Sequence, residues 1–213
     1  MDSAIEIVLL EYETRNEQEH KRIRSAPVEE MLATRDGMLL TVGREVGLLL
    51  NMLARELKAK RILELGTSYG YSTILLAEAA RQTGGRVISI DLQQSKQEYA
   101  RGRLSTLGLN DQVEFRNGDA LDILKTIDGP IDLVLLDLWK ELYVQCLELF
   151  YPKLAPGAVI VADNMIYPPI AHDDARAYRA AVRAKPHIQS MLLPIGQGIE
   201  LSRLVKDLPA YLT

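Results

Sequence analysis

Acidic side chains stand at the ends of the predicted strands, where the chain could do chemistry. There is one acid for each of five strands: Glu64, Asp91, Asp119, Asp137 and Asp163. The carboxyl ends of parallel strands share one edge of a sheet, and ligands bind along that edge. A single aspartate there is weak evidence, because aspartate also caps the helix that follows a strand. Its repetition at five strand ends predicts a ligand site.

Two of these acids form a group with an amide. Asp137 ends one predicted strand, and Asp163 and Asn164 end the next, so their side chains should converge from neighbouring strand ends. Carboxylate and amide oxygens suit a hard cation, which predicts Mg²⁺, or Ca²⁺ or Mn²⁺ in its place. Such a metal could bind two adjacent oxygens of an acceptor molecule and favour the ionised form of one hydroxyl. A helix cap followed by a turn is the alternative interpretation.

Lys140 lies three residues after Asp137, next to Trp139, which is the only tryptophan of the sequence. A lysine near a dication and a cationic ligand should have a lowered pKa, which would let it act as a general base. Trp139 could form an apolar wall for an aromatic acceptor. A surface lysine and a tryptophan of the core are the structural alternatives.

The stretch Arg61–Ser72, RILELGTSYGYS, predicts the second half of the site. A short apolar strand is interrupted by Gly66 and Gly70, and a helix follows, whose free N–H groups could face a ligand. Glu64 would repel a diphosphate but suits a positively charged ligand, such as an ammonium or a sulfonium. This favours S-adenosylmethionine over NAD, and the glycine spacing is not G-x-G-x-x-G.

Two further acids could bind the rest of such a methyl donor. Asp91 follows the second strand, where a carboxylate can accept both ribose hydroxyls of an adenosyl group. Asp119 would face the adenine amino group, and Ala120 would leave room for the ring. A helix cap or a turn is the alternative interpretation, and it carries more weight for Asp119 than for Asp91.

Alternating strands and helices must position these side chains. Strands are predicted at Arg61–Leu65, Arg86–Ile90, Val113–Arg116, Ile131–Leu136 and Ala158–Ala162, and a hairpin at Gln189–Pro194 and Ile199–Val205. Helices are predicted at Ser3–Arg24, Val28–Ala33, Thr41–Leu57 with Thr41 as N-cap, Ser72–Ala80, Ser95–Leu107, Leu121–Ile127, Glu141–Leu154 ended by Pro156-Gly157, and Asp173–Ala184.

This pattern predicts an α/β fold in one domain over residues 1–213, with N-terminal helices in 1–57 and a core in 61–205. The core is a Rossmann-like, doubly wound, mostly parallel seven-stranded sheet with an antiparallel C-terminal edge hairpin.

Composition limits the classes of partner. The net charge of −4 gives no support for a nucleic-acid surface, and no apolar run is long enough for a membrane span. The single Cys146 excludes an internal disulfide and a cysteine metal cluster, and it should be buried. The first residues show no signal-peptide pattern, so a cytoplasmic location is expected.

Four segments together resemble the cation-dependent S-adenosylmethionine O-methyltransferases, the family of catechol and caffeoyl-CoA O-methyltransferases. They are ELGTSYGYS at 64–72, LDLWKELY at 136–143, VADNM at 161–165 and GQGIELSR at 196–203. The resemblance extends from about Leu40 to Val205, and TVGREVG at 41–47 is similar to the segment that covers the donor.

The resemblance implies a metal at Asp137, Asp163 and Asn164, Lys140 as catalytic base together with Asp137, and a homodimer. Acceptor contacts are expected from Trp139, Lys140 and Asn164. Donor contacts are expected from Val42, Glu64, Gly66, Ser68, Tyr69, Gly70, Ser72, Asp91, Leu92, Gly118, Asp119, Ala120 and Asp137, with Glu64 at the methionine end. Leu138 and Leu193-Pro194 depart from the catechol enzymes near the donor and the acceptor, so catechol specificity is not carried over.

The sequence therefore predicts transfer of a methyl group from S-adenosylmethionine to a hydroxyl of a small, catechol-like aromatic acceptor. A metal-independent methyltransferase acting on another oxygen or on nitrogen is the first alternative, and it would stay active in a chelator. A donor-binding protein without catalysis is the second, and it would bind the donor without turnover.

Overall fold

A computed structural model describes residues 2–24, 37–167 and 172–205. The strands are β1 (Arg61–Leu65), β2 (Arg86–Asp91), β3 (Val113–Asn117), β4 (Ile131–Leu136), β5 (Leu154–Ala162), β6 (Ile188–Leu193) and β7 (Ile199–Leu204). The α-helices are α1 (Ser3–Arg24), α3 (Arg44–Glu56), α4 (Tyr71–Thr83), α5 (Gln94–Thr106), α6 (Ala120–Thr126), α7 (Tyr143–Phe150) and α8 (His172–Arg183). The helix expected at Val28–Ala33 lies outside the described residues.

The strands form one sheet in the order β3-β2-β1-β4-β5-β7-β6. β1 to β5 pair in parallel, and β7 pairs antiparallel with both β5 and β6 at the edge. This confirms the predicted doubly wound sheet with its C-terminal hairpin. The chain leaves β1 for β2 in one direction and returns to β4 on the other side of β1, which creates a ligand-binding switch point there.

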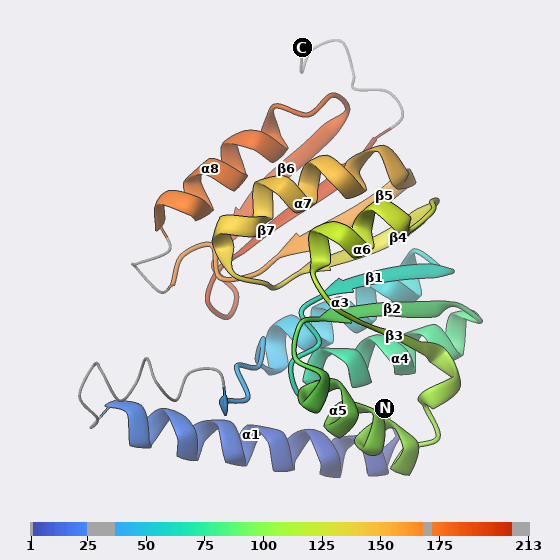
Figure 1. The fold of residues 1–213 in the computed structure, drawn as a ribbon, viewed down its shortest axis with the longest axis vertical. Coiled ribbons are helices and arrows are strands. Elements are labelled where there is room, and N and C mark those ends of the chain that lie inside the picture. Colours follow the sequence, from blue (N-terminus) through green and yellow to red (C-terminus); the bar gives the residue numbers. More distant parts are fainter. Residues whose placement is uncertain (1, 25–36, 168–171, 206–213) are drawn as a thin grey trace.

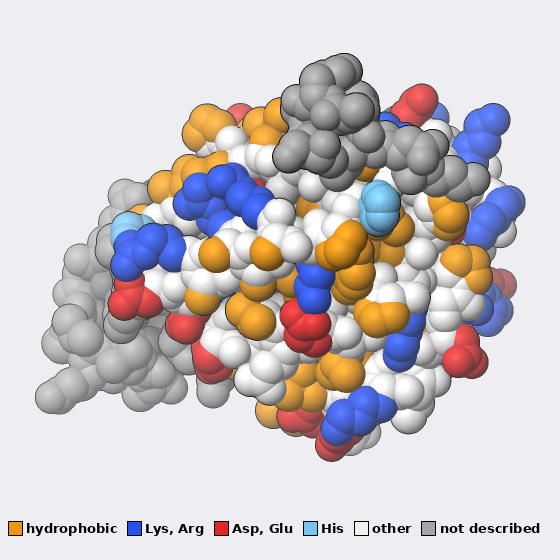
Figure 2. Space-filling view, turned by 90° about the horizontal axis from the view of Figure 1, so that it is seen from above, with side chains coloured by type: hydrophobic (Ala, Val, Ile, Leu, Met, Phe, Trp, Pro, Cys, Tyr) orange, Lys and Arg blue, Asp and Glu red, His pale blue; other side chains and the backbone are white. Residues whose placement is uncertain are grey.

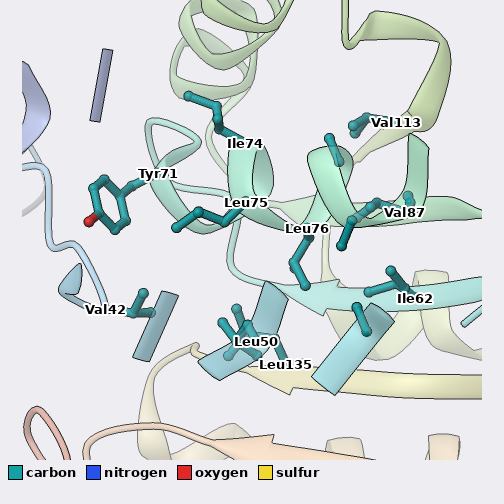
Figure 3. Close-up of a cluster of buried hydrophobic side chains, with 14 of the residues drawn as sticks. Val42, Leu50, Ile62, Tyr71, Ile74, Leu75, Leu76, Val87, Val113 and Leu135 are labelled. Carbon is teal, nitrogen blue, oxygen red and sulfur yellow. The ribbon is translucent and has the colours of Figure 1, made fainter. Parts of the chain in front are cut away.

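Each face of the sheet is covered by its own group of helices (Figure 1). Alternate residues of a strand point to opposite faces. Ile62 and Leu133 therefore pack in one core, with α3 and α4, while Leu63 and Val134 pack in the other, with α6, α7 and α8. Figure 3 shows the first core, in which side chains of α3, α4 and the sheet meet. Glu64 shares the face of Ile62, so its carboxylate points toward α4.

Three predicted boundaries are wrong. Thr41 is not the N-cap of its helix, because α3 begins at Arg44 after Gly43, whose φ of +83° L-residues rarely adopt. The helix expected at Glu141–Leu154 is divided into a 3-10 turn at Lys140–Leu142, α7, and a second 3-10 turn at Tyr151–Lys153. Pro152 in the last piece lacks the N–H that would continue α7. Pro156-Gly157 lies inside β5, where the pairing with β4 is irregular and a proline is tolerated.

The charge distribution of the surface and the burial of the single cysteine agree with what the composition predicts. On the face seen in Figure 2, basic and acidic side chains are interspersed among hydrophobic ones. Cys146 is buried, as predicted. In the part of the chain that the structure describes, none of the helices has the length and apolar character that crossing a bilayer requires.

Candidate functional site

The turn between β1 and α4 needs glycine at both predicted positions. Gly66 has φ +106°, and a Cβ there would lie 2.1 Å from the backbone oxygen of Asp137. Gly70 has φ +92° and caps the N-terminus of α4. The absence of a side chain at Gly66 lets the end of β1 lie directly against the end of β4, and it brings this turn next to Asp137.

A narrow cavity opens beside this turn. One wall is the turn itself, and the other is the segment 39–42, which precedes α3. The lining residues are Leu39, Leu40, Thr41, Val42, Gly66, Thr67, Ser68, Tyr71, Ser72 and Asp137. Val42, Gly66, Ser68, Ser72 and Asp137 are among the predicted donor contacts, so the structure brings this part of the predicted set together around one space.

Glu64 lies beneath the turn and is fully buried. Its Oε1 accepts a hydrogen bond from Ser72 Oγ at 2.6 Å, and its Oε2 accepts from Thr73 Oγ1 at 2.7 Å and from Ser89 Oγ at 2.5 Å. Burial raises the pKa of this carboxyl to about 7, against the effect of the three hydroxyls. Glu64 thus ties β1, β2 and α4 together, and its oxygens face hydroxyls rather than the cavity.

The raised pKa of Glu64 makes stability depend on pH. Because the pKa rises from 4.5 to about 7 on folding, the folded state holds more protons between these values, and its stability falls as pH rises through them. Glu64→Gln should remove a fall on the order of 3 kcal/mol from the free energy of unfolding. Urea unfolding at pH 5 and pH 7.5 measures it, with the exposed Glu98→Gln as control. A wild-type pH dependence in Glu64→Gln would contradict this assignment.

The predicted adenosyl-binding acids lie at the next two strand ends. Asp91 accepts hydrogen bonds from the backbone N–H of Ser68 at 2.7 Å and of Gln93 at 2.8 Å, so it connects β2 to the turn. Asp119 caps α6 by accepting from the N–H groups of Leu121 and Asp122. Each carboxylate makes the structural contacts of the alternative interpretation, and each keeps further lone pairs for a ligand. Gly118, Ala120 and the exposed Leu92 adjoin them.

The second cluster lies where β1, β4 and β5 end. The Asp137 N–H donates to the Leu65 carbonyl, and the Asp163 N–H donates to the Leu136 carbonyl, so the three strand ends are adjacent. Lys140 Nζ lies 3.7 Å from Asp137 Oδ1 and donates to Asn164 Oδ1 at 2.7 Å. The structure therefore brings together the predicted metal ligands and the predicted base.

Burial dominates the electrostatics of this cluster. The pKa of Asp163 is raised to about 8, first by burial and then by the charge of Asp137, whose own pKa burial also raises. Burial lowers the pKa of Lys140, the direction predicted from the sequence, although the prediction attributed it to neighbouring cations. A buried and a partly buried carboxyl with raised pKa values, beside a lysine with a lowered pKa, are typical of a functional site.

The predicted metal ligands lie together and present oxygen atoms. Within residues 2–24, 37–167 and 172–205, no three His, Cys, Asp or Glu side chains form a metal cluster; the predicted set has two carboxylates and one amide. Asp163 Oδ1 is buried without a hydrogen-bond partner, and the charge of Asp137 acts on this carboxyl. A buried, unpartnered carboxylate oxygen beside a second carboxylate is the donor set that a hard cation takes, so these residues fit the metal.

Two residues that contact the site, Gln197 and Tyr143, had not been predicted as site residues. Gln197 Oε1 accepts from Asn164 Nδ2 at 2.8 Å, and Asn164 holds a left-handed φ of +58°. Tyr143 Oη accepts from Lys140 Nζ at 2.6 Å and donates to the Leu136 carbonyl. Both residues stand in the segments that carry the resemblance, which was the one signal for them. Trp139 is exposed next to the cluster.

The known proteins that this chain resembles are methyltransferases. A family model described as a methyltransferase domain matches residues 63–165. The catechol O-methyltransferase of Mycobacterium tuberculosis is 41% identical over 128 residues, 60% of this chain. The caffeoyl-CoA O-methyltransferase of Eucalyptus gunnii is 28% identical over 197 residues, 83% of this chain and 79% of that protein.

A solved structure extends the comparison over most of the fold. The O-methyltransferase TomG from Streptomyces achromogenes, crystallised in complex with SAM, is 30% identical and matches with a TM-score of 0.72. The match covers 84% of this chain and 88% of TomG. The present chain spans 58% of the length of the Mycobacterium tuberculosis relative.

Proposed function

The chain belongs to the class I S-adenosylmethionine-dependent O-methyltransferase family, and we propose that it methylates a hydroxyl of a small, catechol-like aromatic acceptor. The observation that supports the proposal most directly is that Asp137 belongs to both halves of the proposed site. This residue lines the donor cavity and lies 3.7 Å from the Lys140 ammonium. A methyl group presented from the cavity would therefore meet an acceptor held at the cluster.

We assign Asp137, Asp163 and Asn164 as the residues that would hold a divalent cation, with Mg²⁺ as the first candidate. A hard cation bound there would take two adjacent oxygens of the acceptor and favour the ionised form of one hydroxyl. The unpartnered Oδ1 of Asp163 and the raised pKa of this carboxyl support the assignment. A cation would stabilise both carboxylates in their charged forms.

Lys140 is the proposed base. Burial lowers the pKa of its ammonium, which favours the neutral amine that can take a proton. Tyr143 and Asn164 fix the position of Nζ, so the proton acceptor stays at one place beside the metal ligands. The hydroxyl proton moves to Nζ, the acceptor oxygen bonds to the methyl carbon, and the carbon–sulfur bond of the donor breaks. Alignment of the two reactants supplies much of the rate gain in such a displacement.

Titration with S-adenosylhomocysteine in a calorimeter tests the donor half of the proposal. We expect binding of one molecule per chain, with NAD as a non-binding control. No binding of S-adenosylhomocysteine would overturn the donor assignment. The homodimer and the cytoplasmic location expected from the sequence stay predictions.

A further inference from the structure

The N-terminal helix α1 reaches both walls of the donor cavity. In Figure 1 it runs along the lower edge of the molecule, and Glu11 on it pairs with Arg103 of α5. Ile5, Leu9 and the ring of Tyr12 pack in the first core. The Tyr12 hydroxyl and the carboxylates of Glu13 and Glu19 form hydrogen bonds with the segments around the cavity.

Tyr12 holds the turn between β1 and α4. Its hydroxyl donates to the backbone carbonyl of Tyr69 at 2.7 Å, and its ring is buried. Tyr69 stands between Ser68, which lines the cavity, and Gly70, the cap of α4. The guanidinium of Arg15, one helical turn further along α1, lies 4.8 Å from the centre of the Tyr69 ring. The turn is thus fixed at both its backbone and its side chain by α1.

Glu19 holds the opposite wall. Its Oε2 accepts a hydrogen bond from the backbone N–H of Leu39 at 2.8 Å, and its Oε1 accepts from Arg15 Nε at 2.7 Å. Leu39 lines the cavity, and its carbonyl accepts from Ser68 Oγ of the facing wall at 2.8 Å. The two walls therefore contact each other and are also bridged by Arg15 and Glu19 of α1.

Glu13 makes a third contact, with Tyr71. The Tyr71 hydroxyl donates to Glu13 Oε1 at 2.7 Å, while its ring packs at the edge of the first core and lines the cavity. Figure 3 shows this ring beside Val42, with its hydroxyl pointing away from Leu75. Arg44 at the start of α3 also pairs with Glu13, at 3.1 Å. Glu13 thus connects α1, α3 and the first residue of α4.

Spacing explains how one helix makes these contacts. Tyr12, Arg15 and Glu19 are three and four residues apart, so they lie along one face of α1. The helix places one side chain on each wall and a third, Arg15, between them. Ile5 and Leu9 pack in the first core from the preceding turns of this face, which continues toward the C-terminus of α1 with three groups that hydrogen-bond or stack.

We propose that α1 is a positioning element for the methyl donor, with Tyr12 and Glu19 setting the separation of the two cavity walls. The inference rests on the proposed function, because it takes the cavity as the donor site. Neither residue lines the cavity, so each acts through Tyr69 or Leu39 rather than by touching the donor. Loss of either contact should therefore weaken donor binding and leave the acceptor site unchanged.

The variants Tyr12→Phe and Glu19→Ala test the proposal. Tyr12→Phe removes one hydrogen bond and Glu19→Ala removes two, those to the Leu39 N–H and to Arg15. For each variant we expect a dissociation constant for S-adenosylhomocysteine about 3- to 10-fold higher than in the wild type. Glu19→Gln keeps an oxygen that can accept from Leu39 and should restore much of the affinity. In methyl-transfer assays the KM for the donor should rise by a similar factor, while the KM for the acceptor and the turnover at saturating donor stay unchanged.

Tyr151→Phe is the matched control. Its hydroxyl also donates to a backbone carbonyl, that of Pro186, at 2.6 Å and away from the cavity. Wild-type donor affinity in Tyr12→Phe and Glu19→Ala would overturn the inference, as would an equal loss in Tyr151→Phe. Failure of the wild type itself to bind S-adenosylhomocysteine would instead overturn the proposed function, and the inference with it.

Discussion

Replacement of Lys140 by methionine should lower the turnover number about 10²- to 10⁴-fold, the range that a general base contributes. The buried ammonium lies 3.7 Å from Asp137 and donates to Asn164 and Tyr143, and burial lowers its pKa. Methionine keeps the length of the side chain but cannot take a proton. Steady-state kinetics with a catechol acceptor measure the effect, and the KM for the donor should change little.

Two further variants separate chemistry from folding. Lys140→Arg keeps a positive charge that does not deprotonate in proteins, so it should also be nearly inactive. Lys153→Met removes another partly buried lysine, which precedes β5 and whose Nζ donates to the Leu124 carbonyl. This lysine lies far from the carboxyl ends of the strands, so the variant should keep wild-type turnover. Wild-type turnover in folded Lys140→Met would show that the base lies elsewhere.

Asp163→Asn should have the second largest effect, and it should act in opposite directions on activity and on stability. The variant replaces a buried carboxyl beside Asp137, one whose Oδ1 has no hydrogen-bond partner and whose pKa burial raises to about 8. The metal-free protein should gain about 1–2 kcal/mol in free energy of unfolding at pH 7, because folding no longer forces this carboxyl to take up a proton or to keep its charge away from water. The turnover number should fall about 100-fold or more, because a proposed metal ligand loses its charge.

Asp132→Asn is the matched control for this pair of effects. Asp132 lies at the opposite end of the sheet, where its carboxylate accepts from the N–H groups of Lys60 and Arg61. Its replacement should leave turnover unchanged and should not stabilise the protein. Urea unfolding in a chelator and kinetics in Mg²⁺ measure both quantities. An Asp163→Asn variant with wild-type activity would contradict the assignment of this residue.

The sheet and its strand ends could be predicted because they depend on local pattern. Apolar runs such as Ile131–Leu136 give the buried strands, and glycine at Gly66 and Gly70 gives the turn. Because β4 and β5 are neighbouring parallel strands, Asp137 and Asp163 at their ends lie at one edge of the sheet for any conformation of the loops. Asn164 and Lys140 were predicted from their positions just after these strands, and the structure places both at the same strand ends.

Contacts between distant segments could not be predicted in this way. The Tyr12 hydroxyl reaches the Tyr69 carbonyl, and Glu19 reaches the Leu39 N–H, only because α1 folds back along α5 and the turn. Neither residue has a local signature, since both look like ordinary polar positions of a charged helix. The orientation of Glu64 was also inaccessible, because the hydroxyls that hold it come from β2 and α4. Side-chain direction at a strand end is decided by such partners.

The central claim is metal-dependent methyl transfer at the Asp137–Lys140 cluster. Its most direct test is methyl transfer from S-adenosylmethionine to a panel of small catechols, with Mg²⁺ and with excess EDTA. We expect product with Mg²⁺, none in EDTA, and full recovery when Mg²⁺ is added back in excess. Activity that persists in EDTA at the same rate would contradict the claim and favour a metal-independent methyltransferase.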